Sequence, residues 1–377
     1  MKLEASHYDT VEWNPTPIEA GTFINKPKTV YKCKLGNKKE IVLKSPCRID
    51  VGLIDYSALK FTDQNDYKAG EMSFACNVYT YVKVKLLDNP EIIINSDRST
   101  MVKHYALLIK QSTNYKGGFE IETIAPPYHH VGFGSSAIMA ETTALAINKL
   151  LGNPLTDHEL RNLIAYNFVE ESDNNKTKLF PGASTGGSFN TITNGGFVIT
   201  SSECEKIFHE NIPEDMSFVI GIPNVGVKGP EASETDVNCM GWERHNERIN
   251  AAKSCLWIIT EIMPYWVKGD YARVGEAFYN YTFFGGKGMQ MLFYRCNEHG
   301  ILFEQKEAEL EGGWMTSAGP GLVVYTQDLK KVEIAKKIFK RNNCKQIVVV
   351  KGDNQGTTEI DTLPSISIAQ YTSPSHH

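Results

Sequence analysis

A short segment rich in glycine and serine, GFGSSA, begins at Gly132 and stands directly before a predicted helix. Gly132 and Gly134 allow a ligand to approach the backbone closely, and Ser135 and Ser136 add hydroxyl donors. Because a helix N-terminus carries partial positive charge, this pattern is typical of an anion-binding site. The alternative is a tight turn that only happens to precede a helix, since a single glycine-rich loop is weak evidence.

Two further clusters of glycine, serine and threonine lie at junctions between regular segments. They are PGASTGGSFN (residues 181–190) and WMTSAGPGLVVYT (residues 314–326). Backbone N–H groups in such clusters are able to meet phosphate oxygens. Together the three clusters favour a polyphosphate ligand, whose charge normally requires Mg²⁺.

The overall composition is that of an ordinary globular protein. The chain has 377 residues, with 41% hydrophobic and 22% charged residues, and its 39 Lys+Arg against 44 Asp+Glu give a formal net charge of −5. A protein that binds nucleic acid through phosphate contacts usually has a basic domain, so we expect no nucleic-acid partner. The length predicts two domains.

No segment resembles a membrane span or a secretion signal. No apolar run approaches the roughly 18 residues that a span needs, and the first residues lack the apolar centre of a signal peptide. The eight cysteines are scattered without a C-x-x-C pair, so we expect neither disulfides nor zinc. These features predict a cytoplasmic enzyme with no membrane partner.

The first half of the chain reads as strands followed by helices. Several strands, mostly antiparallel, are expected between residues 30 and 95, in the runs VYKCKL, EIVLKSP, CRIDVGLID, FACNVYTYVKVKLL and EIIINS. A helix near 99–111, a strand at 117–124 and a helix from Ala137 follow. Thr156 with Glu159 three residues later forms a capping box, which predicts a second helix over 157–170.

The second half alternates strands and helices. Strands are expected at 196–202, 217–224, 322–326 and 345–350, with helices near 271–284, 288–309 and 329–341 and a helical stretch from 243 to 267 that Pro264 interrupts. The chain is therefore predicted to be α+β. We divide it into an N-terminal extension (1–29), an N-terminal domain (30–205) and a C-terminal domain (206–377).

The order of these segments resembles the superfamily of galactokinase, homoserine kinase, mevalonate kinase and phosphomevalonate kinase, the GHMP superfamily. HHVGFGSSA (residues 129–137) is similar to its phosphate loop, SPCRIDVGLIDYS (45–57) to its substrate-side strand, and TSAGPGLVVYT (316–326) to its third motif. The resemblance implies a ribosomal-protein-like α/β domain, a ferredoxin-like C-terminal domain and a site between them.

Within this superfamily the motifs look most like those of the β-ribofuranosylaminobenzene 5′-phosphate synthases and related C-nucleoside synthases. The similar segments are RIDVGLID, PGASTGGSFNTITNGGFVI, IPNVG, VGEAF and TSAGPGLVVY, in the same order. The resemblance implies a reaction that joins an aromatic carboxylic acid to phosphoribosyl diphosphate (PRPP) with loss of CO₂ and diphosphate. The acceptor stays open between 4-aminobenzoate, 4-hydroxybenzoate and a heteroaromatic acid.

One missing carboxylate separates the synthases from many of the kinases. Those kinases place an aspartate seven residues before the Gly-Gly pair, and here that position is Ser188. No carboxylate lies between Pro181 and Gly196, which disfavours a kinase that uses this aspartate. An ATP-dependent small-molecule kinase stays as the alternative, followed by a non-catalytic role.

The resemblance also implies roles for particular residues. Arg48 and Asp55 are the candidate catalytic residues, and Ser136 and Glu170 are the candidate ligands of Mg²⁺. The candidate diphosphate and phosphate ligands are Gly132, Gly134, Ser135, Ser136, Thr185, Gly186, Gly187, Thr316, Ser317 and Gly319. The alternatives are a structural pair of Arg48 with Asp55 and a solvated helix-end charge for Glu170. The superfamily also makes a homodimer possible.

Other conspicuous residues are less promising. His129 and His130 precede the phosphate loop, where either side chain could donate to an anion. Arg244 and Arg248 would share a helix face and could bind phosphate, but a solvated face is the simpler interpretation. The aromatic run 278–284 is expected in the core. Two departures from the synthases, Asp50 in place of their histidine and GSSAI in place of GSGTQ, put the acceptor in doubt.

Overall fold

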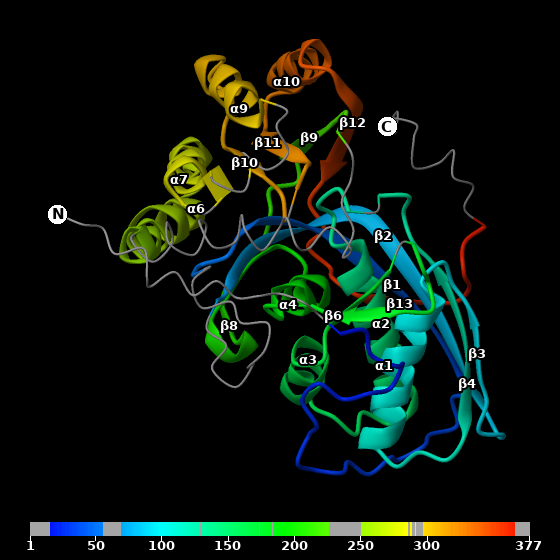
Figure 1. Cartoon of the computed structure of the whole chain (residues 1–377). Helices are drawn as coiled ribbons and strands as arrows, with labels where there is room; N and C mark the ends of the chain where they lie inside the picture. Colours follow the sequence, from blue (N-terminus) through cyan, green and yellow to red (C-terminus); the bar gives the residue numbers. More distant parts are fainter. Residues whose placement is uncertain are drawn as a thin grey trace, which may run out of the picture.

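The computed structural model describes residues 16–55, 69–128, 130–172, 174–182, 184–225, 250–285, 287–288, 291, 297–317 and 319–365. These residues form two larger sheets with helices packed on each of them, and a separate two-stranded sheet (Figure 1). The predicted α+β class is confirmed.

The first sheet is built around one long antiparallel pair, β1 (Glu40–Gly52) and β2 (Glu71–Leu87). The sheet order is β13-β1-β2-β4-β3, and β7 pairs with β2 and β8 with β7. The bounds of the other strands are β3 (Ile92–Asn95), β4 (Gly118–Ile124), β7 (Phe197–Thr200), β8 (Lys206–Glu210) and β13 (Thr358–Ile360). The pairs are antiparallel except β3 with β4, which is parallel.

Two expectations for this sheet need correction. The run 40–46 and the first part of the run 47–55 form one strand that ends at Gly52, with a register shift between Pro46 and Cys47, because proline lacks the N–H that a regular ladder requires and is tolerated at a bulge. Residues 30–35 form no strand. Instead, Tyr31 N–H and Lys34 N–H donate to the carbonyls of Ser112 and Leu151 at helix ends (2.8 and 2.9 Å).

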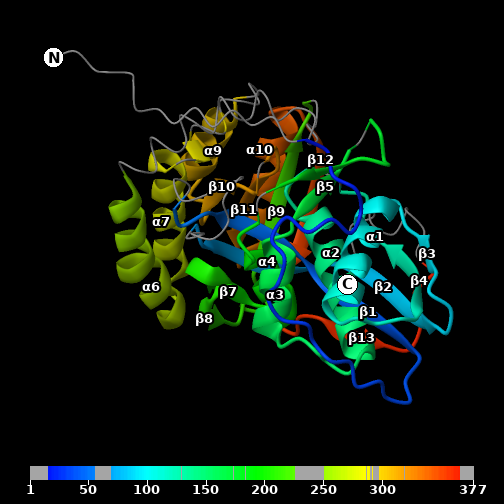
Figure 2. The same ribbon diagram turned by 60° about the horizontal axis from the view of Figure 1, so that its bottom comes forward.

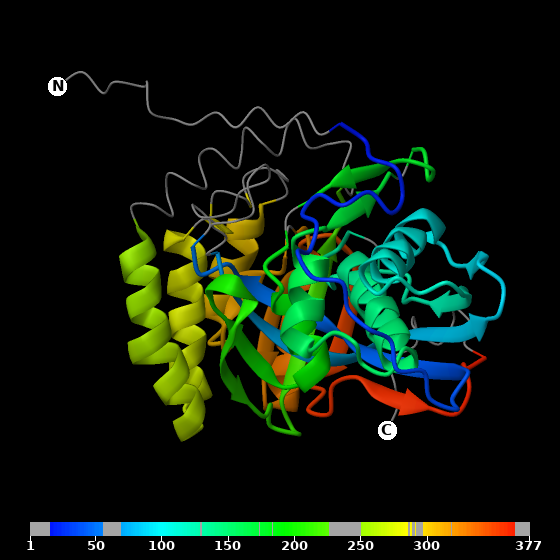
Figure 3. The same cartoon turned by 90° about the horizontal axis from the view of Figure 1, so that it is seen from below.

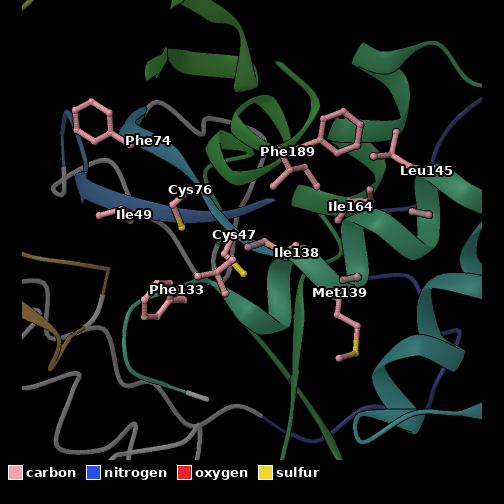
Figure 4. Close-up of a cluster of buried hydrophobic side chains, with 14 of the residues drawn as sticks. Cys47, Ile49, Phe74, Cys76, Phe133, Ile138, Met139, Leu145, Ile164 and Phe189 are labelled. Atoms are coloured by element: carbon pink, nitrogen blue, oxygen red, sulfur yellow. The ribbon is translucent and has the colours of Figure 1, made fainter. Parts of the chain in front are cut away.

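Four helices cover one side of the first sheet (Figure 3). They are α1 (Ser99–Ser112), α2 (Ser135–Leu150), α3 (Asp157–Ala165) and α4 (Gly187–Asn194). Helix α2 is buried along nearly its whole length, which is typical of a helix in the centre of a core. Side chains of β1, β2, α3 and α4 pack around it (Figure 4).

The helix predictions hold in type and differ at the ends. Thr156 and Glu159 form the predicted capping box, with Glu159 N–H donating to Thr156 Oγ1 (3.3 Å). Helix α3 ends at Ala165, and Glu170 lies in the short strand β5 (Val169–Glu171), which pairs with β6 (Leu179–Pro181). Helix α4 occupies part of the glycine-rich run that the sequence analysis treated as a loop.

The second sheet is antiparallel, with strand order β10-β11-β9-β12 (Figure 2). Its strands are β9 (Ser217–Pro223), β10 (Gly313–Met315), β11 (Leu322–Thr326) and β12 (Cys344–Lys351). The accompanying helices are α6 (Met263–Lys268), α7 (Tyr271–Phe284), α9 (Glu298–Glu307) and α10 (Leu329–Arg341).

The sequence predicts that Pro264 interrupts the helical stretch, but the chain stays helical through this residue. Residues 250–257 are helical, Ile258–Ile262 form a π-helical turn, and α6 then carries Pro264 in its first turn. A wider turn just before proline accommodates a residue that lacks an N–H donor. Arg244 and Arg248 lie outside the described residues.

The chain returns to the first sheet after completing the second. Asp353 N–H donates to Ala75 O (3.0 Å) and Gly196 N–H to Asp353 O (2.7 Å), and β13 then pairs with β1. The first sheet thus contains two strands, β8 and β13, that follow residue 205. The division of the chain at that residue stays a prediction. Among the described residues, no helix combines the length and the apolar composition that crossing a bilayer demands.

Candidate active site

The glycine-rich loop meets the third predicted cluster at Gly132. This residue has φ +101°, and a Cβ atom there would lie 2.7 Å from Thr316 O, so only glycine fits. Thr316 Oγ1 donates to Gly132 O (2.9 Å) and accepts from Asp50 N–H (3.0 Å). One buried hydroxyl therefore fixes the loop, β1 and the segment after β10 against one another.

The loop ends at the N-terminus of α2, where Gly134 is the N-cap with φ 67°. Ser135 and Ser136 are buried in the first turn, which contains no acidic residue and no side-chain cap. A Cβ atom at Gly134 would lie 3.1 Å from Arg48 Nε. The positive end of a 16-residue helix thus faces a guanidinium group, an arrangement that favours an anion.

Two N–H donor atoms of Arg48 have no hydrogen-bond acceptor in the described part of the chain. Its Nη1 atom lies 3.4 Å from Glu71 Oε1 and 3.7 Å from Asp50 Oδ2. In the described part of the chain, Arg48 Nε and Nη1, Asp50 Oδ1 and Glu71 Oε1 are buried without a hydrogen-bond partner. Burial lowers the pKa of Arg48, but Glu71, Asp50 and Glu141 together raise it above its ordinary value. The group is a charged donor beside the loop.

Lys287 adds a second cation that the sequence analysis missed. Its side chain is 2% exposed, with Nζ 3.6 Å from Asp50 Oδ2. The same Nζ donates to Ser317 O. A lysine between glycines, in the run GGKG, was the signal that could have drawn attention to it. Asp50 therefore lies between Arg48 and Lys287, and it was noted at first only as a departure from the synthases.

The N-terminus of α4 holds a carboxylate of the chain. A Cβ atom at Gly187 would lie 2.8 Å from Glu71 Oε2, and Thr185 Oγ1 donates to that oxygen. Gly187 N–H donates in turn to Thr185 Oγ1 (3.0 Å). Glu71 thus occupies the position that the prediction gave to phosphate. Phosphate binding by Thr185, Gly186 and Gly187 stays a prediction, and an ionised Glu71 opposes it.

A second carboxylate reaches the start of α4 from α2. Ser188 Oγ donates to Glu141 Oε1, and Glu141 is 1% exposed. Burial raises the pKa of Glu141 to about 8, although Ser188 and Arg48 lower it. The segment 181–196 contains no carboxylate, and the one beside Ser188 comes from another helix, where a motif confined to that segment does not reveal it.

Asp55 lies beyond the end of β1, and Glu170 lies in β5. Asp55 N–H donates to Ala69 O (2.8 Å) beyond the end of β1, and the carboxylates that face Arg48 are Asp50 and Glu71. Glu170 lies in β5 opposite Phe180. In the described ranges, no three His, Cys, Asp or Glu side chains are arranged to hold a metal ion.

The other predicted residues border the loop. Ser317 has φ 53°, and Gly319 N–H donates to Thr316 O (2.9 Å). His130 Nε2 contacts Arg98 Nη2 at 3.0 Å, and His129 lies outside the described residues. Phe278, Tyr279 and Tyr281 of α7 are buried in the core as expected, whereas Phe283 is half-buried and Phe284 is exposed.

Residues 100–175 match the family model of the GHMP kinases N-terminal domain. These residues run from α1 through β4, α2 and α3 to β5. The family match and the observed fold point to the same superfamily. The GHMP kinase superfamily is supported for this chain. Among curated protein sequences, none matches it.

Solved structures resemble the fold over most of the chain. A homoserine kinase from Cytophaga hutchinsonii is 14% identical with TM-score 0.60, over 87% of this chain and 99% of that one. A mevalonate diphosphate decarboxylase from Staphylococcus aureus is 17% identical with TM-score 0.62, over 86% and 98%. The structure of MDDEF in complex with MVAPP, AMPPCP and magnesium is 16% identical with TM-score 0.60, over 86% and 99%. The two-domain GHMP-type fold is thereby confirmed.

The predicted C-glycoside synthase is wrong, and so are PRPP and an aromatic acid as its substrates. The neighbours of this fold are a homoserine kinase and mevalonate diphosphate decarboxylases, which favour the kinase alternative. The error has a physical cause. A glycine-rich loop does not distinguish one phosphate ligand from another, and a carboxylate that the segment 181–196 lacks reaches Ser188 from Glu141 on α2.

Proposed function

We propose that this protein is an ATP-dependent enzyme of the GHMP superfamily that transfers a phosphoryl group to a hydroxyl of a small molecule. The observation that carries the proposal is the N-terminus of α2, which has a glycine entry, no acid in its first turn and the buried, incompletely hydrogen-bonded Arg48 beside it. A helix end with an adjacent guanidinium is suited to a polyphosphate.

In this proposal each residue around the loop has a separate role. The backbone N–H groups of the first turn of α2, with the hydroxyls of Ser135 and Ser136, hold the nucleotide phosphates. Arg48 stabilises the charge that develops on the transferred group, since fixed cations are the main source of catalysis in phosphoryl transfer. Thr316 keeps the loop in position through Gly132. Lys287 and Asp50 fix the orientation of Arg48 from the other side.

Magnesium fits this donor set as a partner of the nucleotide. Mg²⁺ is usually held by one or two protein oxygens together with phosphates and water, which agrees with the lack of a three-residue cluster in the described ranges. The neighbour bound to AMPPCP and magnesium supports the same choice. Ser136 and Glu170 are the residues that we propose to hold the ion. When bound, it neutralises charge on the β- and γ-phosphates.

Thermal unfolding tests the nucleotide. With Mg²⁺ present, ATP or AMPPCP at about 100 times its dissociation constant should stabilise the fold by about 2.7 kcal/mol, which shifts the midpoint by a few degrees. PRPP at the same concentration is the control and should produce a much smaller shift. Stabilisation by PRPP with none by ATP would contradict the proposal.

Turnover tests the reaction. Incubation with MgATP and a panel of small hydroxy acids, amino alcohols and polyols should give ADP and one phosphorylated acceptor in equal amounts. The phosphorylated product, identified by ³¹P NMR, shows which hydroxyl accepts the group. Consumption of ATP that yields AMP and diphosphate would contradict a kinase.

A further inference from the structure

The buried carboxylate of Glu141 has one oxygen that is engaged and one that is not. Oε1 accepts from Ser188 Oγ and the Phe189 N–H also acts on the carboxylate, whereas Oε2 has no hydrogen-bond partner in the described residues, although the side chain is only 1% exposed. Burial of such an oxygen costs free energy unless a partner arrives. An orphaned acceptor at this depth therefore points to a donor outside the described residues.

Glu141 is placed within reach of the phosphate loop. It lies six residues after Ser135 on the same helix, which corresponds to about 9 Å along the axis at 1.5 Å per residue. Side chains of a helix lean toward its N-terminus, so the carboxylate is nearer to the loop than its backbone is. Arg48, which contacts Gly134, is among the charges that act on Glu141.

The orphaned atoms form a complementary pair. Among the residues that the structure describes, Arg48 Nε and Nη1 are buried donors without hydrogen-bond partners, and Glu141 Oε2 is a buried acceptor without one. A hydroxyl that attacks a phosphoryl group presents both counterparts: its proton needs an acceptor, and the phosphoryl oxygens need donors. Resting on the proposed function, we propose that Glu141 takes the proton of the acceptor hydroxyl during phosphoryl transfer, and that Ser188 is the positioning residue that orients its carboxylate.

The acceptor oxygen forms a bond to the γ-phosphorus of ATP, and the bond from that phosphorus to the β,γ-bridging oxygen breaks with its electron pair going to ADP. The hydroxyl proton passes to Glu141 Oε2, which gives a neutral carboxylic acid. This proton is released to water when the products leave, and the carboxylate is restored.

The surroundings of Glu141 determine when it is able to act. The groups that influence its charge come from every neighbouring element: Arg48 on β1, Glu71 on β2, Tyr105 on α1, Ser188 on α4 and Cys204 in the turn before β8. Burial raises the pKa of Glu141 to about 8. Only the ionised form accepts a proton, so the rate should rise with pH through this range.

The first experiment compares variants across pH. The reaction measured is ADP release from MgATP between pH 6 and 9.5. The acceptor is the hydroxyl compound from the panel that becomes phosphorylated, or water if none does. Glu141→Gln should lower kcat about 100- to 1,000-fold and abolish the alkaline rise, with KM for ATP nearly unchanged. Ser188→Ala should lower kcat less and move the rise to higher pH, because the Ser188 hydrogen bond favours the ionised form.

Asp353→Asn is the matched control. Asp353 is also a buried carboxylate of the first sheet, but both of its oxygens are engaged, by Gln355 and Gly356 N–H groups and by Tyr79 Oη. This variant should lose stability and keep both kcat and the pH profile. Glu141→Gln with unchanged kcat and the same alkaline rise overturns the inference.

A second measurement does not depend on turnover. The carboxyl signal that Glu141→Gln removes from the ¹³C NMR spectrum should titrate near pH 8, and AMPPCP with Mg²⁺ should move that titration to higher pH more than ADP does, because the γ-phosphate brings negative charge close to the carboxylate. Stabilisation by AMPPCP with no change in this titration overturns the inference and leaves the proposed function standing. Absence of stabilisation by either nucleotide contradicts the proposed function itself.

Discussion

Helices α2 and α4 begin in the same way and face opposite charges. Both have a glycine N-cap in the left-handed region, Gly134 at φ 67° and Gly186 at φ 68°, and neither has a side-chain cap or an acid in its first turn. The end of α2 faces the guanidinium of Arg48, whereas the end of α4 faces the carboxylate of Glu71. Glycine-rich entries alone therefore do not identify an anion site.

The neighbouring side chain decides what each helix end is able to bind. A helix N-terminus favours negative charge. At α4 the chain itself supplies the carboxylate of Glu71, whose pKa burial raises, with Thr185 as an intermediary. At α2 the chain supplies a cation beside the helix end, which suits an anionic ligand. The two ends are about equal in backbone geometry and differ in the charge next to them.

Replacing Arg48 should produce the largest effect. Arg48→Met removes the cation that lies 3.4 Å from Glu71 and 3.7 Å from Asp50, and leaves buried carboxylates uncompensated. We expect the free energy of unfolding in urea to fall by about 3–5 kcal/mol, and the thermal shift with MgATP to disappear. The double variant Arg48→Met with Glu71→Gln should recover part of the stability and none of the MgATP shift. A retained shift in Arg48→Met would remove the distinction between the two helix ends.

The buried carboxylate of Glu141 should make the free energy of unfolding depend on pH. The folded pKa of Glu141 is raised from 4.5 to about 8, so the folded chain binds the proton more tightly than the unfolded chain does. The resulting stabilisation is full below about pH 4.5 and is lost as the pH rises through about 8. Between pH 5 and 8 the unfolding free energy of the wild type should fall, relative to Glu141→Gln, by up to about 1.4 kcal/mol per pH unit. Parallel curves for the two proteins, obtained from urea titrations, would show that Glu141 titrates normally.

Gly187→Ala tests the end of α4. Its Cβ would lie 2.7 Å from the Cδ of Glu71, and relief of this clash should cost about 1–3 kcal/mol in urea unfolding. The MgATP shift should be retained, because this end already holds a carboxylate of the chain. Loss of MgATP binding would place nucleotide phosphate at α4 and revive the predicted roles of Thr185 and Gly186.

Gly134→Ala should have the smallest effect on stability and a clear effect on binding. A left-handed conformation costs alanine about 1 kcal/mol relative to glycine. The new Cβ, at 3.1 Å from Arg48 Nε, should also displace the guanidinium and weaken MgATP binding about 10-fold in isothermal titration calorimetry. Equal binding in Gly134→Ala and the wild type would show that Arg48 does not serve the ligand at α2.

The sequence allows much of the fold to be predicted and only part of the site. The capping box at Thr156 and the periodicity of 329–341 are local patterns, and the structure contains both. The loop at Gly132 and its approach to Thr316 follow from motifs whose residue types suit close backbone contact. Contacts between distant elements leave no such local pattern.

Three residues illustrate that limit. Glu71 lies just before the predicted strand run 74–87 and Glu141 lies in a predicted helix, yet both carboxylates reach the start of α4, from β2 and α2. Lys287 comes from the other end of the chain to Asp50, a sequence separation of 237 residues. Short motifs therefore locate the glycine-rich loop in the sequence but do not identify the reaction.

The return of the chain to β1 has a consequence for synthesis. Residues 353–360 hydrogen-bond to Ala75, to Gly196 and along β1, so the first strand of the sheet is closed by residues that are translated much later. On the ribosome, the outer edge of β1 stays open until β13 has emerged. The nascent first domain thus waits with an unpaired strand edge, which is the kind of surface that chaperones protect from mispairing.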